Sequence, residues 1–245
     1  MKISVITATY NSEKLIERCL QSVHDQTLEC EHIIIDGCST DKTNVLVQNK
    51  KRTHDRHIIE EDDGIYDALN KGIKNATGDI IAILNSDDYF ASVTSLEMIL
   101  EKFKSGAEIV YGGTQYCTSL GGIGAVYIPT KFNGPGSFLN GWHPPHPSFY
   151  ALKSCYDKSG SFLLDLTVAS DFELMFRFFE VNRFKSSWLP LILVNMDPGG
   201  YSSTWKNRLV GYNDIKKSFQ IHGKSASIWY FLKRYSTKVV ERYKW

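Results

Sequence analysis

The sequence predicts an α/β protein whose core is a mostly parallel β-sheet covered by helices on both faces. Short segments rich in β-branched residues alternate with amphipathic helical segments over the first 110 residues or so. The strand segments are apolar throughout, which is typical of parallel strands buried between two layers of helices. Polar or acidic residues follow these strands, at the edge where such sheets bind ligands.

The first half of the chain is predicted to read β-α-β-α-β-α-β-α-β. Apolar strands are expected at residues 2–10, 31–37, 57–64 and 79–85. Helices are expected at residues 15–23, around Val45, and at 64–78 and 95–106, with Gly78 as the C-cap of the third helix. The residues that converge on one edge are therefore Thr7, Ala8, Thr9, Asp36, Asp62, Asp63, Asp87 and Asp88.

The chain changes character after about residue 111. Residues 111–129 are rich in Gly and Tyr, which indicates short antiparallel strands, and a proline-rich loop follows. Residues 162–180 are expected to start extended and to become helical from about Asp171. Residues 184–197 read as a further strand, and the chain from about Lys206 reads as helical and increasingly basic.

Composition excludes several classes of protein. The 245 residues carry a formal net charge of +1, which does not fit a strongly basic nucleic-acid-binding protein. The five cysteines are scattered and form no CxxC pair, so we expect reduced thiols in a cytoplasmic protein. We find no signal peptide and no run near the roughly 20 apolar residues that span a bilayer. Any membrane contact is therefore expected to be peripheral, at the inner face of the cytoplasmic membrane.

Asp87 and Asp88 are adjacent carboxylates at a strand end. Hard divalent cations prefer oxygen ligands, so this pair fits a metal–diphosphate site. A turn followed by a helix cap would use the same residues. Asp36 and Asp63, at neighbouring strand ends, could accept hydrogen bonds from a nucleoside, or could simply cap helices. Neither a GxGxxG motif nor a P-loop is present, so metal neutralisation of a diphosphate is favoured over a glycine-rich cradle.

Asp171 is the candidate general base. It lies where the pattern turns helical, and the helix dipole would help to keep it ionised. A simple N-cap role explains the same position. His143 and His146 are separated by prolines, which makes a helical metal-binding pair improbable and leaves a substrate contact as the functional interpretation.

Three ordered motifs resemble glycosyltransferase family 2: SVITATYNSEKLIERCLQSV, IIIDGCSTDKT and EDDGIYDALNKGIKNATGDIIAILNSDD. They cover residues 3–90 almost without a gap. Farther on, HPSFY, VASDFELMFR and GGYSS resemble a subgroup that adds sugars to lipid-linked precursors of bacterial surface polysaccharides, of the O-antigen or colanic acid type. This second resemblance extends to about residue 204.

The resemblance implies a GT-A fold, with a Rossmann-like sheet, a small antiparallel portion and C-terminal helices. It implies inverting transfer from a nucleotide sugar with Mn2+ or Mg2+. The expected donor contacts are Thr7, Thr9, Asp36, Asp63, Lys71 and Asp87. Asp88 is the expected metal ligand and Asp171 the expected base. His146, Gly199, Gly200 and Ser202 match positions that would contact the acceptor or the diphosphate.

This sequence departs from the family pattern at two places. Ser86 replaces the first acid of the D-x-D motif, and Ser170 replaces the acid that usually precedes the base. By resemblance, residues 1–204 form the catalytic domain, with a nucleotide-binding half (1–110) and an acceptor-binding half (111–204). Residues 205–245 form a helical tail. Its basic and aromatic part, residues 226–245, fits either an anionic membrane surface or a helix packed on the domain.

The sequence therefore predicts a hexosyl- or N-acetylhexosaminyltransferase that uses a nucleotide sugar, with UDP favoured as carrier. The expected acceptor is a polyprenyl-diphosphate-linked saccharide, and no nucleic acid is expected as partner. Two rivals remain: a nucleotidyltransferase, and a nucleotide-sugar-binding protein of the same fold without activity. A nucleotidyltransferase would be expected to carry a glycine-rich basic loop after the first strand, which ATYNSEKL is not.

Overall fold

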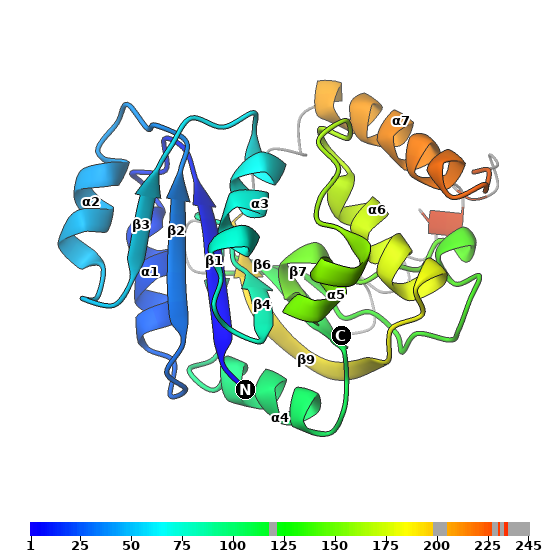
Figure 1. Cartoon of the computed structure of the whole chain (residues 1–245), viewed down its shortest axis with the longest axis horizontal. Coiled ribbons are helices and arrows are strands. Elements are labelled where there is room, and N and C mark those ends of the chain that lie inside the picture. Colours follow the sequence, from blue (N-terminus) through cyan, green and yellow to red (C-terminus); the bar gives the residue numbers. More distant parts are fainter. Residues whose placement is uncertain (118–121, 198–204, 227–229, 231–232, 235–245) are drawn as a thin grey trace.

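The fold is a single mixed β-sheet with helices on both faces (Figure 1). The computed structural model describes residues 1–117, 122–197, 205–226, 230 and 233–234. The strands are β1 (Ile3–Thr9), β2 (Glu31–Asp36), β3 (Arg56–Ile59), β4 (Ile80–Ile83), β5 (Tyr89–Phe90), β6 (Ile109–Cys117), β7 (Ile123–Tyr127), β8 (Phe149–Leu152) and β9 (Ser186–Met196). The helices are α1 (Ile16–His24), α2 (Thr43–Lys50), α3 (Ile65–Asn75), α4 (Ser95–Lys104), α5 (Lys153–Ser159), α6 (Ser170–Phe176) and α7 (Trp205–Ile221).

The sheet is mostly parallel, as predicted. The strand order is β3-β2-β1-β4-β8-β6-β9-β5, and β7 pairs with β6. β1 pairs in parallel with β2 and β4, β2 with β3, and β6 with β9. β8 runs antiparallel between β4 and β6, while β5 and β7 are antiparallel to β9 and β6. The second half of the chain thus extends the sheet of the first half.

Alternating side chains of the central strands pack into two separate apolar cores, one on each face of the sheet. Ile6 of β1 packs in the core that includes Leu69 and Ile73 of α3. Val5, its neighbour, faces the opposite side, in the core that contains Val23 of α1 and Leu96 of α4. This arrangement explains why the strands read as continuous apolar runs, because both faces of each strand are removed from water. Burial of each such side chain stabilises the fold by about 1.5–3 kcal/mol.

Two local predictions are wrong. Residues 162–169, predicted as extended, form no strand, and α6 begins at Ser170, close to the predicted start. Gly78 does not cap α3, whose C-cap is Ala76. Gly78 instead lies against the first strand, where an added Cβ would come within 2.8 Å of the carbonyl oxygen of Lys2. Close backbone approach, not helix termination, explains this glycine.

A buried ion-pair network anchors α6. Glu173 and Arg177, four residues apart, form an ion pair with Nη2 2.8 Å from Oε2. Glu173 also bonds His222, whose Nε2 lies 2.7 Å from Oε1. The Arg177 guanidinium additionally donates to the carbonyl groups of Ser159, Gly160 and Ser161. One arginine therefore ties α6 both to the end of α5 and, through Glu173, to the residue that follows α7.

The described residues of the tail pack on the domain. Tyr230 is 2% exposed and contacts the rings of Phe172 and Phe219. The guanidinium carbon of Arg234 lies 5.2 Å from the centroid of Phe172. This favours the packed-helix interpretation for these residues, while most of residues 226–245 lie outside the described part. Among the described residues, no helix has the length and apolar character needed to cross a bilayer.

Candidate functional site

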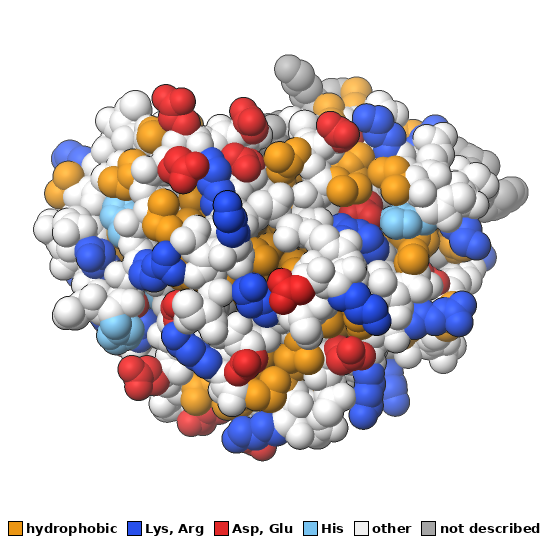
Figure 2. Space-filling view, viewed as in Figure 1, with side chains coloured by type: hydrophobic (Ala, Val, Ile, Leu, Met, Phe, Trp, Pro, Cys, Tyr) orange, Lys and Arg blue, Asp and Glu red, His pale blue; other side chains and the backbone are white. Residues whose placement is uncertain are grey.

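The carboxyl ends of the parallel strands meet at one edge of the sheet. Thr9 at the end of β1 is in register with Asp36 at the end of β2, and Asp36 with Ile59 at the end of β3. The loop after β4 holds Asp87 and Asp88 next to β1. Figure 1 shows the carboxyl ends of β1, β2 and β3 at the upper left of the molecule, and Figure 2 shows exposed acidic side chains there as well as on the lower half of this face. The sheet thus places Thr9 beside Asp36, and the Asp87–Asp88 loop follows β4, the other parallel neighbour of β1.

The first two strands offer one free polar atom and one buried carboxylate. Thr9 is 4% exposed, and its Oγ1 has no hydrogen-bond partner among the described residues. Asp36 is fully buried and accepts hydrogen bonds from Ser39, from its N–H at 2.6 Å and its hydroxyl at 2.7 Å. A ligand could use Thr9 directly, whereas a ligand bound by Asp36 must share that carboxylate with Ser39.

Thr7 lies differently from the prediction. Its side chain is fully buried, and its hydroxyl lies 3.0 Å from Nε2 of His32 and 3.8 Å from Sγ of Cys19. A hydroxyl that is bonded inside the protein is a poor donor for a nucleoside. The position of Thr7 therefore does not fit a direct side-chain contact.

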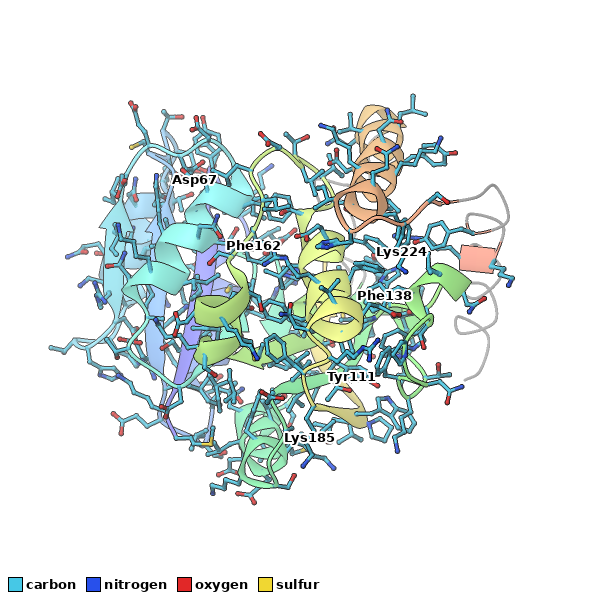
Figure 3. All side chains as sticks on the ribbon, turned by 45° about the vertical axis from the view of Figure 1, so that its right-hand side comes forward. Asp67, Tyr111, Phe138, Phe162, Lys185 and Lys224 are labelled. Carbon is cyan, nitrogen blue, oxygen red and sulfur yellow. The ribbon has the colours of Figure 1, made fainter. Side chains whose placement is uncertain are left out.

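The loop between β3 and α3 brings further charged groups to the same edge. Asp63 is exposed, and its N–H donates to Oδ2 of Asp67 at 3.2 Å. Lys71 lies one turn farther along α3, with Nζ 3.0 Å from Oδ2 of Asp67 and 3.4 Å from Oε1 of Glu60. Figure 3 shows Asp67 at the upper end of α3. Lys71 is thus held by acids, which position its ammonium group near the strand ends.

The loop after β4 contains a carboxylate in an unusual environment. Asp88 is 2% exposed, and its Oδ2 accepts one hydrogen bond, from the Asn85 amide at 3.2 Å. Burial, together with the nearby charge of Asp87, raises the pKa of Asp88 well above its ordinary value. Burial also raises the pKa of Asp87. A nearby cation would stabilise the ionised forms of both carboxyl groups, so this loop could hold a divalent metal ion.

Two residues missed by the sequence analysis complete this loop. Arg18 of α1 donates from Nη2 to the carbonyl oxygen of Asp87 at 3.0 Å and to Oδ2 of Asp197 at 2.8 Å. Its guanidinium also lies over the ring of Tyr89, 4.3 Å from the centroid. Asp197 follows β9, and pairing of β5 with β9 brings it beside the loop. Its sequence signal was the same as for Asp36: an acid directly after an apolar strand.

Asp171 occupies a second centre, at the start of α6. The hydroxyl of Tyr66, from α3, lies 3.1 Å from Oδ1 of Asp171 and 2.9 Å from the carbonyl oxygen of Val168. The Tyr66 ring stacks on Phe162, with centroids 5.3 Å apart. Figure 3 shows Phe162 beside α3, on the segment that leads to α6. Tyr66, which the sequence analysis missed, holds Oδ1 of Asp171, and no described residue bonds Oδ2, which could therefore serve a substrate.

His146 belongs to this second centre. Its ring meets Phe162 edge-on at 5.7 Å, and its Nε2 is buried without a hydrogen-bond partner among the described residues. Burial lowers the pKa of His146, although the Asp171 carboxylate opposes the shift. A neutral imidazole with a free nitrogen therefore lies near the candidate base. Gly199, Gly200 and Ser202 lie outside the described residues.

A sequence comparison decides the family. The model of glycosyl transferase family 2 matches residues 4–151, more than half of the chain.

The chain belongs to glycosyl transferase family 2.

Known members and solved structures agree with this assignment. A Bacillus subtilis protein named "Putative teichuronic acid biosynthesis glycosyltransferase TuaG" is 41% identical over 90 residues, which is 35% of this chain and 36% of TuaG. The fold resembles the crystal structure of S. aureus TarS 1–349 in complex with UDP-GlcNAc (TM-score 0.70, 20% identity, 95% of this chain and 69% of that chain). It also resembles the mannosyltransferase PcManGT from Pyrobaculum calidifontis in complex with GDP-Man and Mn2+ (TM-score 0.65, 19% identity, 98% and 69%).

These similarities confirm the GT-A fold and identify a glycosyltransferase. The family match covers the strand ends that carry Thr9, Asp36, Asp63 and Asp88. It ends before Asp171, so the second centre rests on the geometry described above. Family membership also favours glycosyl transfer over the rival nucleotidyl transfer.

Proposed function

We propose that this family 2 protein is an inverting, metal-dependent glycosyltransferase. It moves a hexose or N-acetylhexosamine from a UDP-sugar to a polyprenyl-diphosphate-linked saccharide during synthesis of a bacterial surface polysaccharide. The observation that carries the proposal is the presence of two separate carboxylate centres on one scaffold. One is the buried Asp87–Asp88 loop, suited to a cation; the other is Asp171, suited to a base.

The donor would bind along the strand ends. Asp36, Asp63 and the free hydroxyl of Thr9 would bind the nucleoside, because carboxylate and hydroxyl oxygens can accept from a base N–H or a ribose hydroxyl. Lys71 would lie near the same group, and Thr7 would act only by supporting the strand. Asp87 would contact the ribose or the sugar. The structural neighbour with bound UDP-GlcNAc has the same fold, which supports a donor of this class.

Asp88 would hold Mn2+ or Mg2+. Buried oxygen ligands with few protein partners suit these ions, which fill their remaining positions with phosphate oxygens. When bound, the ion would offset negative charge on the departing diphosphate. The Mn2+ in the mannosyltransferase structure supports a metal in this fold.

Asp171 would take the proton from the acceptor hydroxyl. The hydroxyl oxygen then forms a bond to the anomeric carbon while the bond from that carbon to the diphosphate oxygen breaks. The electron pair of the broken bond leaves with the UDP, and the configuration inverts in one displacement. Tyr66 would orient the carboxylate by its bond to Oδ1. A positioned base of this kind contributes about 10²–10⁴-fold to the rate.

The acceptor would approach on the Asp171 side. His146, with its free buried nitrogen, is the proposed acceptor contact, and Gly199, Gly200 and Ser202 are proposed for acceptor phosphate or donor diphosphate. A lipid-linked acceptor is supported by the resemblance alone, whereas the name of TuaG supports a role in the synthesis of a cell-surface polymer. We propose peripheral contact of residues 226–245 with the membrane that carries this acceptor.

The proposal can be tested by release of UDP from a panel of UDP-sugars with a lipid-diphosphate acceptor. The wild-type protein should release UDP from one donor with Mn2+ or Mg2+, and a chelator should stop the release. Asp171→Asn should lose about 10²–10⁴-fold in rate but keep donor affinity, because the base acts on the acceptor. Asp165→Asn is the matched control, since Asp165 is exposed and near in sequence.

No release from any donor would overturn the enzyme proposal and favour a binding protein. Full activity of Asp171→Asn would overturn the base assignment alone. Full activity in chelator would overturn the metal assignment alone.

A further inference from the structure

A cluster of nitrogen and oxygen ligands lies at the end of the sheet opposite the donor site. It consists of His24, the last residue of α1, His32 near the start of β2, and Asp55, which directly precedes β3. One ligand atom from each residue lies within 4.8 Å of the other two. The donor-site residues lie at or after the carboxyl ends of the strands, whereas His32 and Asp55 lie at the amino ends of β2 and β3, and His24 ends the helix that precedes β2.

His32 is the unusual member of this cluster. It is fully buried, its Nε2 lies 3.0 Å from the hydroxyl of Thr7, and its Nδ1 is buried with no partner among the described residues. Complete burial lowers the pKa of His32. If Nε2 donates to Thr7, Nδ1 carries a free lone pair. A buried polar atom without a partner is costly, and a bound ion would remove that cost.

The other two residues are spaced like neighbouring ligands of one ion. His24 Nε2 lies 3.1 Å from Asp55 Oδ2. Two ligands bound tetrahedrally to Zn2+ at about 2.0–2.1 Å are separated by about 3.3 Å, so this pair needs little movement. His24 and Asp55 are also largely buried, with side-chain exposures of 15% and 0%.

Arg52 fixes the orientation of the Asp55 carboxylate. Its Nε and Nη2 donate to Oδ1 at 3.0 and 2.8 Å, and its backbone N–H donates to Oδ2 at 2.7 Å. This leaves the outer side of Oδ2 towards His24. The positive charge of Arg52 offsets the negative charge of Asp55, so the environment of a bound ion would have no net charge. Zinc sites built from three neutral histidines show that Zn2+ accepts this condition.

We propose that His24, His32 and Asp55 form a second metal site, selective for Zn2+ or a similar transition-metal ion. Two imidazole nitrogens favour such an ion over Mg2+, which prefers the all-oxygen environment of Asp88. The ion joins α1, β2 and the segment before β3, and so stabilises the nucleotide-binding half. This site does not depend on the proposed transfer reaction.

The experiment measures Zn2+ binding to the purified full chain by calorimetry and by the change in melting temperature. Co2+ serves as a spectroscopic probe of the same site. Wild type should bind one Zn2+ that persists in Asp88→Asn, and should show the visible bands of tetrahedral Co2+. His24→Gln should weaken Zn2+ binding by at least about 10–100-fold, because loss of even an outer-shell partner costs that much. His54→Gln is the matched control, since His54 is half-exposed and faces the Arg52-bound oxygen at 4.0 Å.

The proposal is overturned if wild type gains no thermal stability with Zn2+. The proposal is equally overturned if Zn2+ no longer raises the melting temperature of Asp88→Asn but still raises that of His24→Gln, because the ion would then occupy the donor site. His24 is partly exposed, so its variant should fold even if a His32 variant does not.

Discussion

Replacement of Arg177 by methionine should destabilise the fold more than any ordinary surface substitution. Arg177 is 8% exposed and binds both oxygens of the fully buried Glu173, at 2.9 and 2.8 Å. Loss of one partner of a buried pair leaves an uncompensated charge and costs about 3–5 kcal/mol. His222 still contacts Glu173 in the variant, so the lower end, about 3 kcal/mol, is expected.

This cost corresponds to a fall in melting temperature of about 6–12 °C for a chain of this size, at about 2–4 °C per kcal/mol. Thermal unfolding followed by circular dichroism measures it. Arg56→Met is the matched control, because Arg56 is exposed on β3 and should lose little stability. The double variant Glu173→Leu/Arg177→Met should recover part of the loss, since no buried charge then remains. A single variant as stable as wild type, or a double variant no more stable than the single, would contradict the role assigned to the buried ion pair.

Three further predictions concern the active site and acid stability. Tyr66→Phe removes the bond to Asp171 and should lower kcat about fivefold, for roughly 1 kcal/mol, in the UDP-release assay; an unchanged kcat would rule out a positioning role. Metal-free Asp88→Asn should be about 0.5–2 kcal/mol more stable than wild type near pH 7. The folded-state pKa of Asp88 is raised, so ionisation costs stability as pH rises above the unfolded value, and this gap should shrink towards pH 4 in thermal melts. Burial raises the pKa of Glu31, but hydrogen bonds from Ser4 and Thr77 outweigh it and lower the pKa below the ordinary value of 4.5. The folded state should therefore lose stability as the pH falls below 4.5. Glu31→Gln should make the melting temperature less dependent on pH in this range.

The edge of the sheet that carries the donor site could be predicted because its residues obey a local rule. The last residue of a parallel strand and the loop residues that follow it lie at the ligand edge whatever the rest of the chain does: Asp36 ends β2, and Asp63 and Asp88 lie in the loops after β3 and β4. Asp36, Asp63 and Asp88 follow this rule. Asp197 follows it too, but the sequence does not reveal that β9 pairs with β5 and lies beside the Asp88 loop. Pairing between strands that are distant in sequence is a tertiary property.

At the second centre, too, the sequence predicts the helix, and only the tertiary structure reveals the contact. A helix starting near Asp171 is readable from periodicity, whereas the partner of its carboxylate, Tyr66, comes from a helix more than 100 residues earlier. The Thr7 hydroxyl shows the reverse error. Its position near the strand end suggests a ligand contact, but Thr7 lies two residues before the last residue of β1, Thr9, on the same face. There its hydroxyl is bonded to His32 and Cys19 inside the protein.

Local patterns in the chain were enough to predict the α/β class, the family, the order of the elements in the first half, and the acids at the strand ends. These features depend on hydrophobic period and on residues close together in the chain. The tertiary structure decided which side chains meet: Arg18 with Asp197, Tyr66 with Asp171, and His24 with His32 and Asp55. Such meetings depend on how helices and strands pack, because contacts between distant segments follow from the buried area of the whole fold and not from any local pattern.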